Sequence, residues 1–275
     1  MQILEWNWKS SDGINMYGHS WAPEGQIKAV VLLVHGLGEH VGRYEHVAAA
    51  FTERGYALLG FDLRGHGKSG GPRGHTPSYQ ALMDDITEFI KQADTRFPGL
   101  PRFLYGHSLG GNLVLNYVLR CRPNLPGVLV TGPWLELAFQ PPAFQVKLGK
   151  IMNGVFPGFT QKSNLNTKGL SHDQAVVTAY ERDPLVHDKI TARLFVTTYE
   201  SGLWALEHAV KFPLPILLMH GSADPITSAK ASQLFAERAG DKVTVKIWDG
   251  MYHEIHNEFD QAQVFKVMLD WLDKH

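Results

Sequence analysis

The chain has 275 residues, of which 44% are hydrophobic and 19% are charged, and this globular composition excludes a disordered protein. Its 26 basic and 27 acidic residues give a net charge of −1, so no basic surplus indicates nucleic-acid binding. The single cysteine excludes a disulfide framework. No apolar run approaches the roughly 20 residues of a membrane-spanning helix. The first residues do not resemble a signal peptide, so we expect a cytoplasmic protein.

Segments typical of strands and of helices alternate along most of the chain. The predicted strands cover residues 4–8, 14–21, 28–35, 56–61, 103–105, 128–131, 215–220 and 243–248. The predicted helices cover residues 41–54, 78–97, 109–120, 192–210, 227–238 and 258–273. Strands that alternate with helices predict an α/β fold, with a mostly parallel sheet and helices on both of its faces.

The alternation stops between Pro133 and about Ile190, where we predict no strand and where prolines and aromatic residues are frequent. The pattern on both sides of this break belongs to one sheet. We therefore interpret residues 134–190 as an insertion into a single domain that spans residues 1–275, not as a domain of its own.

The strongest local signal is Gly106-His107-Ser108-Leu109-Gly110, which matches Gly-x-Ser-x-Gly between a predicted strand and a predicted helix. In that setting the serine sits on a sharp turn with its hydroxyl exposed, and the flanking glycines are needed because a Cβ would collide with neighbouring chain. A glycine-rich turn that only suits helix packing is the alternative. We predict that Ser108 is a nucleophile.

A serine nucleophile needs a base, and the base needs a carboxylate to orient it. In this architecture the chain order is Ser, then Asp or Glu, then His. Asp224 follows the predicted strand 215–220, and His253 and His256 follow the last strand. We predict Asp224 as the acid, against a role in the turn alone. His253 is predicted as the base because it lies nearer the strand end, and His256 is assigned to packing.

The other predicted catalytic groups are backbone N–H donors for the developing oxyanion. Leu109 follows the nucleophile directly, and Leu37 lies in the glycine-rich loop after the first buried strand. A tight structural turn is the alternative for that loop. The two late histidines lack a third ligand and do not match His-Glu-x-x-His, so we expect no metal ion. The predicted chemistry requires no cofactor.

Together these motifs resemble the α/β-hydrolase fold superfamily, and within it the monoacylglycerol lipase and lysophospholipase-like branch. The matching segments are His35-Gly-Leu-Gly-Glu-His40, Asp62-Leu-Arg-Gly-His-Gly-Lys-Ser69, Gly106-His-Ser-Leu-Gly-Gly111, His220-Gly-Ser-Ala-Asp-Pro225 and His253-Glu-Ile-His-Asn-Glu258. The resemblance implies the same triad and the same two oxyanion donors. It also implies that the inserted segment is a cap over the active site.

The inserted segment is dense in large apolar side chains, which suit an acyl-chain pocket beside a polar catalytic centre. The residues that we expect to contact substrate are Trp134, Phe139, Phe144, Ile151, Phe156 and Phe159. The alternative is that these side chains only pack the segment onto the core. With an almost neutral chain, we expect at most transient contact with a membrane or micelle.

The sequence thus predicts a serine hydrolase that cleaves lipid-like carboxylic esters, with monoacylglycerol as the expected substrate. One alternative is hydrolysis of lysophospholipids, of short-chain or aromatic esters, or of peptides. An alternative of a different class is a scaffold that binds a small ligand without catalysis. An epoxide hydrolase or dehalogenase would need an aspartate where Ser108 stands. The oligomeric state, the acyl-chain preference and the positional selectivity are left open.

Overall fold

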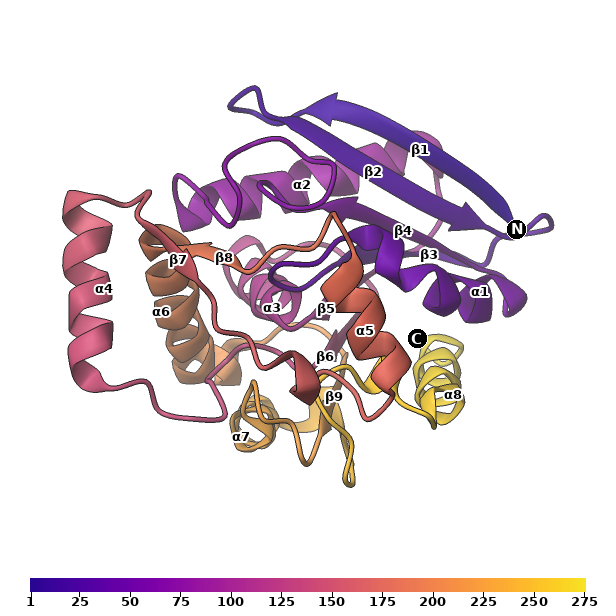
Figure 1. Ribbon diagram of the computed structural model, residues 1–275. Coiled ribbons are helices and arrows are strands. Elements are labelled where there is room, and N and C mark those ends of the chain that lie inside the picture. The colour runs from indigo at the N-terminus through magenta and orange to yellow at the C-terminus, as the bar shows by residue number, and fades with distance from the viewer.

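The centre of the molecule is an eight-stranded sheet, shown in Figure 1 in a computed structural model that describes residues 1–275. Its strand order is β1-β2-β4-β3-β5-β6-β9-β10. The strands are β1 (Gln2–Lys9), β2 (Asn15–Ala22), β3 (Ala29–Val34), β4 (Tyr56–Asp62), β5 (Arg102–His107), β6 (Val128–Thr131), β9 (Ile216–Gly221) and β10 (Val243–Trp248). Strand β2 pairs antiparallel with β1 and with β4, and all the other pairs are parallel. The predicted mostly parallel sheet is confirmed.

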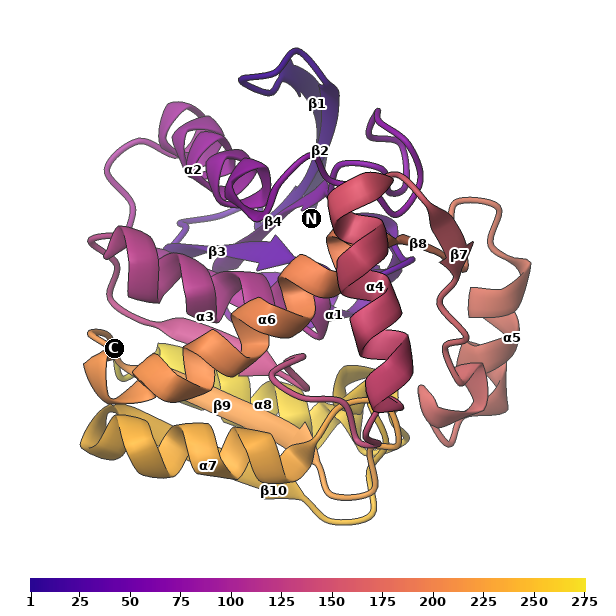
Figure 2. The same cartoon turned by 90° about the vertical axis from the view of Figure 1, so that its left-hand side faces the viewer.

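Helices cover both faces of this sheet (Figures 1 and 2). One face packs against α1 (Glu45–Glu53) and α8 (Gln261–Leu272). The other face packs against α2 (Tyr79–Arg96), α3 (Leu109–Cys121), α6 (Ala192–His208) and α7 (Ala229–Ala239). The helix predicted over residues 41–54 begins as a 3₁₀ turn at Val41–Tyr44 and continues as α1.

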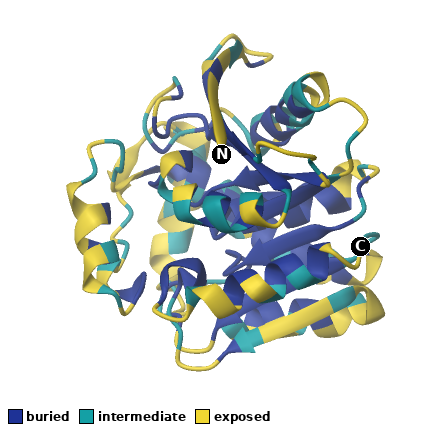
Figure 3. Ribbon diagram, turned by 90° about the vertical axis from the view of Figure 1, so that its right-hand side faces the viewer, coloured by how far each residue is buried: buried dark blue, intermediate teal, exposed yellow.

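Strand β3 shows why its sequence carries no polar alternation. Val30, Leu32 and Val34 point into the core beneath α2 and α3. Val31 and Leu33 point into the core beneath α1 and α8. Both faces are therefore buried, as expected for a central parallel strand. Figure 3 shows the central strands in the colour of buried residues, while the edge strands β1 and β10 are largely exposed.

The inserted segment, residues 134–190, contains α4 (Ala143–Val155), a 3₁₀ turn (Thr167–Gly169) and α5 (Gln174–Arg182). It also contains β7 (Thr160–Lys162), which pairs antiparallel with β8 (Lys189–Thr191). The prediction that this region has no strand is therefore wrong. Each strand has only three residues, and all of β7 is exposed. Neither a buried apolar run nor an alternating pattern marks them in the sequence.

The two helices of the inserted segment differ in how they meet the rest of the molecule. Helix α4 has no buried residue and lies across α6 at the outside of the molecule (Figure 2). Helix α5 buries Val177 and Tyr180. None of the helices in the chain combines the length and apolarity needed to cross a bilayer.

The turn from β5 into α3 brings the helix unusually close to the sheet. A Cβ on Gly110 would collide with the carbonyl oxygen of Val34, and a Cβ on Gly106 would collide with the carbonyl of Gly110. The expectation that these glycines avoid such collisions is confirmed. Because only glycine fits, the sequence fixes the distance between the first turn of α3 and the ends of β3 and β5.

We expect Gly110→Ala to lower the free energy of unfolding by about 2–3 kcal/mol, because the methyl group forces α3 away from the sheet. Gly154→Ala is the matched control, since a Cβ on Gly154 in α4 meets nothing within 4 Å. Alanine at position 154 should stabilise the helix by about 0.5–1 kcal/mol. Denaturant unfolding of both variants checks the prediction, and equal effects at the two positions would contradict it.

Candidate active site

Ser108 lies between β5 and α3 in a strained backbone conformation. Its φ of 54° and ψ of −115° place a non-glycine residue in a sparsely populated region. It is held there because its N–H donates to Thr131 O at 3.0 Å, while its carbonyl accepts from Asn112 N–H at 3.0 Å. The strained turn presents the side chain at the carboxyl end of the parallel strands, where ligands bind in such sheets.

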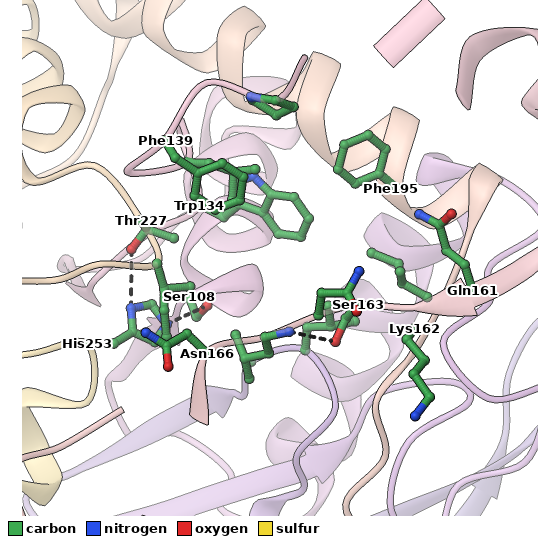
Figure 4. Close-up of a pocket in the computed structure, with 18 of the residues that line it drawn as sticks. Ser108, Trp134, Phe139, Gln161, Lys162, Ser163, Asn166, Phe195, Thr227 and His253 are labelled. Atoms are coloured by element: carbon green, nitrogen blue, oxygen red, sulfur yellow. Dashed lines mark hydrogen bonds between the residues drawn. The ribbon is translucent and has the colours of Figure 1, made fainter. Parts of the chain in front are cut away.

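The structure brings Ser108, Asp224 and His253 together from three distant parts of the chain. Ser108 Oγ lies 2.9 Å from His253 Nε2, and His253 Nδ1 lies 2.7 Å from Asp224 Oδ2. Figure 4 shows Ser108 and His253 side by side, with Thr227 above the imidazole. Because the carboxylate accepts at Nδ1, the neutral imidazole carries its proton there. Nε2 is then left to accept the serine proton.

Two residues that the sequence analysis did not single out hold the Asp224 carboxylate. His220 Nε2 and the Thr227 hydroxyl each lie 2.9 Å from Oδ2, while Ile226 N–H donates to Oδ1 at 2.7 Å. His220 in turn contacts Ser232 Oγ at 2.8 Å through Nδ1. The signal for His220 is present in the sequence, because it ends the strand four residues before Asp224.

These contacts shift the pKa values of the acid and the base in opposite directions. Burial by itself raises the pKa of the Asp224 carboxyl, but the charge of His253 and the hydrogen bonds from His220 and His253 outweigh it and lower the pKa. Burial by itself lowers the pKa of His253, but the charge of Asp224 and its hydrogen bond outweigh burial and raise the pKa above 6.5. The pair therefore combines an ionised carboxylate with a strengthened base.

The two predicted oxyanion donors are free to bind an oxygen. Neither the Leu37 N–H nor the Leu109 N–H donates to any group of the chain. Leu109 is the first residue of α3, so its N–H has no acceptor within the helix. Leu37 lines the same cavity as Ser108. A Cβ on the neighbouring Gly36 would lie 3.2 Å from the Ser108 Cβ, which places this loop directly beside the serine.

A buried ion network joins the loop of residues 35–40, here called the glycine loop, to the loop of residues 249–258, here called the histidine loop. Arg43 donates to Glu39 Oε2 at 2.7 Å and to both carboxylate oxygens of Glu254 at 2.7 and 2.8 Å. Glu39 Oε1 accepts from Gly36 N–H at 2.6 Å and from the Tyr44 hydroxyl at 2.9 Å. Arg43 therefore links the Leu37 region to the residue that follows His253.

A cavity of about 760 Å³ opens above Ser108 and His253. Figure 4 shows Trp134, Phe139 and Phe195 on one side of it and polar residues of the segment 161–166 on the other. The predicted contact residues that line the cavity are Trp134, Phe139, Phe144 and Phe159. Side chains that were not predicted complete the apolar lining, among them Leu148, Met152 and Phe195.

Two of the predicted contact residues, Ile151 and Phe156, do not line the cavity, and these two predictions are wrong. Ile151 is 53% exposed and Phe156 is 59% exposed. Each residue of an α-helix is turned by about 100° from the one before it. Met152 of α4 therefore faces the cavity while Ile151 is turned toward solvent. Phe156 follows the last helical residue, where helical periodicity no longer predicts direction.

Comparison with known proteins places the chain in a family. Residues 25–260 match the family described as serine aminopeptidase, S33. The chain belongs to this family of α/β-hydrolases. No three His, Cys, Asp or Glu side chains are arranged to hold a metal ion.

Individual known proteins resemble the chain over nearly its full length. A monoacylglycerol lipase of Mycolicibacterium smegmatis is 32% identical, over 96% of this chain and 94% of that protein. The crystal structure of Paleococcus ferrophilus monoacylglycerol lipase superposes with a TM-score of 0.84 at 32% identity, covering 99% of this chain and 98% of that one. An abhydrolase domain-containing protein of Dictyostelium discoideum is 38% identical over 97% of this chain, and the chain spans 28% of that protein's length.

We expect His253 and His256 to titrate at very different pH values. His253 should take up its proton above pH 6.5 because Asp224 stabilises the cation, whereas burial lowers the pKa of His256 to about 3. Asp224→Asn removes the negative charge and should lower the pKa of His253 while leaving that of His256 in place. Imidazole NMR signals followed over pH measure both. An unchanged His253 pKa in the variant would contradict the assigned pair.

Proposed function

We propose that the chain is a serine esterase that hydrolyses monoacylglycerols through an acyl-enzyme. The observation that carries the proposal is the contact of Ser108 Oγ with His253 Nε2, at 2.9 Å, on the floor of a cavity with an apolar wall. The S33 family membership supports a serine hydrolase, and the names of the two monoacylglycerol lipases that resemble the chain support this substrate class.

In the first half of the reaction, Ser108 Oγ attacks the ester carbonyl carbon while its proton moves to His253 Nε2. Negative charge develops on the carbonyl oxygen, which the N–H groups of Leu37 and Leu109 stabilise by hydrogen bonds. Asp224 stabilises the imidazolium that forms. When the tetrahedral intermediate collapses, the carbon–oxygen bond to glycerol breaks. His253 gives its proton to the glycerol oxygen, and the acyl group stays on Ser108.

In the second half, a water molecule gives a proton to His253 Nε2 and attacks the acyl carbon. The same two N–H groups stabilise the second tetrahedral intermediate. Its collapse releases the fatty acid and returns the proton from His253 to Ser108 Oγ. The enzyme is then in its starting state, and one water has been consumed for each ester cleaved.

The charged groups of the cavity favour a neutral ester over a peptide with a free amino terminus. An aminopeptidase needs a carboxylate that is free to bind the substrate's ammonium group. Glu39 and Glu254 line the cavity, but Arg43 donates to both of them. The other oxygen of Glu39, Oε1, accepts from Gly36 N–H and the Tyr44 hydroxyl, and Glu254 Oε2 also accepts from the Asn257 amide. Neither carboxylate is left for substrate.

The outer surface of α4 and its flanks supports transient contact with the lipid aggregate from which the substrate comes. Its large apolar side chains are exposed beside the cavity, namely Phe139, Phe144, Leu148, Ile151, Val155 and Phe156. An exposed apolar patch of this kind is typical of a membrane-contacting or ligand-binding surface.

We expect Ser108→Ala to abolish hydrolysis of monoacylglycerols and labelling by a fluorophosphonate, because both need the serine oxygen. Ser11→Ala, in an exposed turn, is the control and should keep both activities.

In the wild-type chain, kcat/KM should fall at acid pH with a midpoint above 6.5, because His253 must be neutral to accept the proton and its pKa is raised. A wild-type chain that binds monoacylglycerol but is neither labelled nor active would instead support the non-catalytic scaffold.

We expect Phe159 and Phe156 to differ sharply in their effect on acyl-chain preference. Phe159 lines the cavity and Phe156 does not. Phe159→Ala should lower kcat/KM for long-chain p-nitrophenyl esters by about tenfold, since roughly 1.5 kcal/mol of apolar contact with the acyl chain is lost. Acetyl and butyryl esters should be hardly affected. Phe156→Ala should match the wild-type chain for every ester, and a similar loss in both variants would contradict the assigned lining.

A further inference from the structure

The inserted segment is tied to the histidine loop by backbone and side-chain hydrogen bonds at one end of α5. His253 N–H donates to Gly169 O at 3.2 Å, and Glu254 N–H donates to Leu170 O at 2.8 Å. His172 Nδ1 contacts Glu258 Oε1 at 2.9 Å, and its ring stacks on Tyr252 with the centroids 3.7 Å apart. The backbone of the proposed base and of the next residue is thus hydrogen-bonded to the segment that leads into α5.

The other end of α5 is tied to the glycine loop. His187 N–H donates to Gly38 O at 2.9 Å. His40 Nε2 lies 2.9 Å from Asp183 Oδ2; the His40 side chain is buried and that of Asp183 is partly exposed. The Arg43 guanidinium lies over the ring of Tyr180, 4.7 Å from its centroid. These contacts hold the stretch of chain that directly follows Leu37.

The segment before α5 and Tyr180 of α5 also pack against the loop that carries Asp224. Leu170 and Tyr180 form a small buried cluster with Ile226, which follows Asp224 by two residues. A Cβ on Gly169 would collide with the ring of Pro225, the next residue after Asp224. The region from residue 169 to residue 187 therefore contacts all three loops that surround Ser108.

Helix α4 makes no comparable contacts. It has no buried residue, and its one ion pair is Lys150 Nζ to Glu200 Oε1 at 2.9 Å, between half-exposed side chains of α4 and α6. Figure 1 shows α4 at the far side of α6, away from the strand ends where α5 lies. The region around α5 is thus hydrogen-bonded to the loops around Ser108, whereas α4 is not.

We propose that residues 169–187, with α5 at their centre, are a positioning element that holds the glycine loop and the histidine loop at their working distance across Ser108. This inference rests on the proposed function. His172 and Asp183 are its two anchors and act through His253 and the Leu37 N–H, without touching substrate. Helix α4 contributes to substrate binding alone. The inserted segment therefore sets both the rate of the chemical step and the choice of substrate, through separate helices.

The proposal predicts a loss of kcat when either anchor is cut. A displacement of about 1 Å in a catalytic group costs on the order of a hundredfold in rate, so a partial loosening in His172→Ala or Asp183→Ala should lower kcat for a monoacylglycerol by about tenfold, with KM changed by less than about twofold. The rate of Ser108 labelling by a small fluorophosphonate should fall in the same proportion, because that probe needs no acyl-chain contacts.

Three further variants separate positioning from general stability. Asp183 accepts from His40 through Oδ2 and from Leu185 N–H through Oδ1. Asp183→Asn keeps one oxygen that can accept from His40 but loses the second acceptor, so it should restore kcat to a value between those of Asp183→Ala and the wild type. His172→Phe keeps the ring on Tyr252 but loses the contact with Glu258, and should fall between wild type and His172→Ala. Glu200→Gln cuts the α4–α6 ion pair and should keep the wild-type kcat. Thermal unfolding of each variant shows that the measured chains are folded.

Wild-type kcat and labelling rates in both alanine variants would overturn the positioning role. So would a loss confined to KM, or a loss that Asp183→Asn fails to restore and Glu200→Gln reproduces. These outcomes are distinct from a failure of the proposed function, in which the wild-type chain itself neither hydrolyses an ester nor reacts with the fluorophosphonate.

Discussion

The contact between the Asp224 carboxylate and His253 Nδ1 is the interaction on which the rest of the site depends. An ionised carboxylate with no exposed surface is costly unless it is fully hydrogen-bonded. Asp224 meets this demand with His253, His220, the Thr227 hydroxyl and the backbone N–H of Ile226. The same bonds that make its burial tolerable orient the imidazole toward Ser108 and raise the pKa of His253. One set of hydrogen bonds thus both stabilises the buried carboxylate and orients His253 toward Ser108.

A second set of buried charges, those of Arg43, Glu39 and Glu254, is also fully hydrogen-bonded. Arg43 lies between Glu39 and Glu254, and every oxygen of the two carboxylates has a donor. Breaking such a pair leaves an unpaired buried charge, which is far more costly than the pair itself is stabilising. The glycine loop and the histidine loop are therefore joined twice, by the ion pairs of Arg43 and by contacts with residues 169–187. The cavity beside Ser108 has an exposed apolar wall along α4.

The strands, the strained turn at Ser108 and the meeting of Ser108, Asp224 and His253 could be predicted because each has a local sequence signal. A doubly buried strand needs an uninterrupted aliphatic run, as in β3, and a close strand–helix turn needs glycine at positions 106 and 110. The sequence signals in the inserted segment are weaker. Its short strands β7 and β8 carry no pattern. Which side chains of α4 face the cavity depends on how that helix is rotated against α6, and this rotation separates Leu148 and Met152 from Ile151. Phe156 follows the last residue of α4, and Phe195 belongs to α6.

The sequence by itself determined the α/β sheet, the strained serine turn and the identity of the three residues that meet there, because short-range sterics and strand order dictate them. Only the tertiary structure decided that Arg43 joins the glycine loop to the histidine loop, and that residues 169–187 contact all three loops around the serine. The most distant of these contacts, His40 with Asp183 and Arg43 with Glu254, join residues 143 and 211 positions apart. No local pattern encodes such pairs, since their geometry exists only after the sheet has assembled and the inserted segment has docked on it.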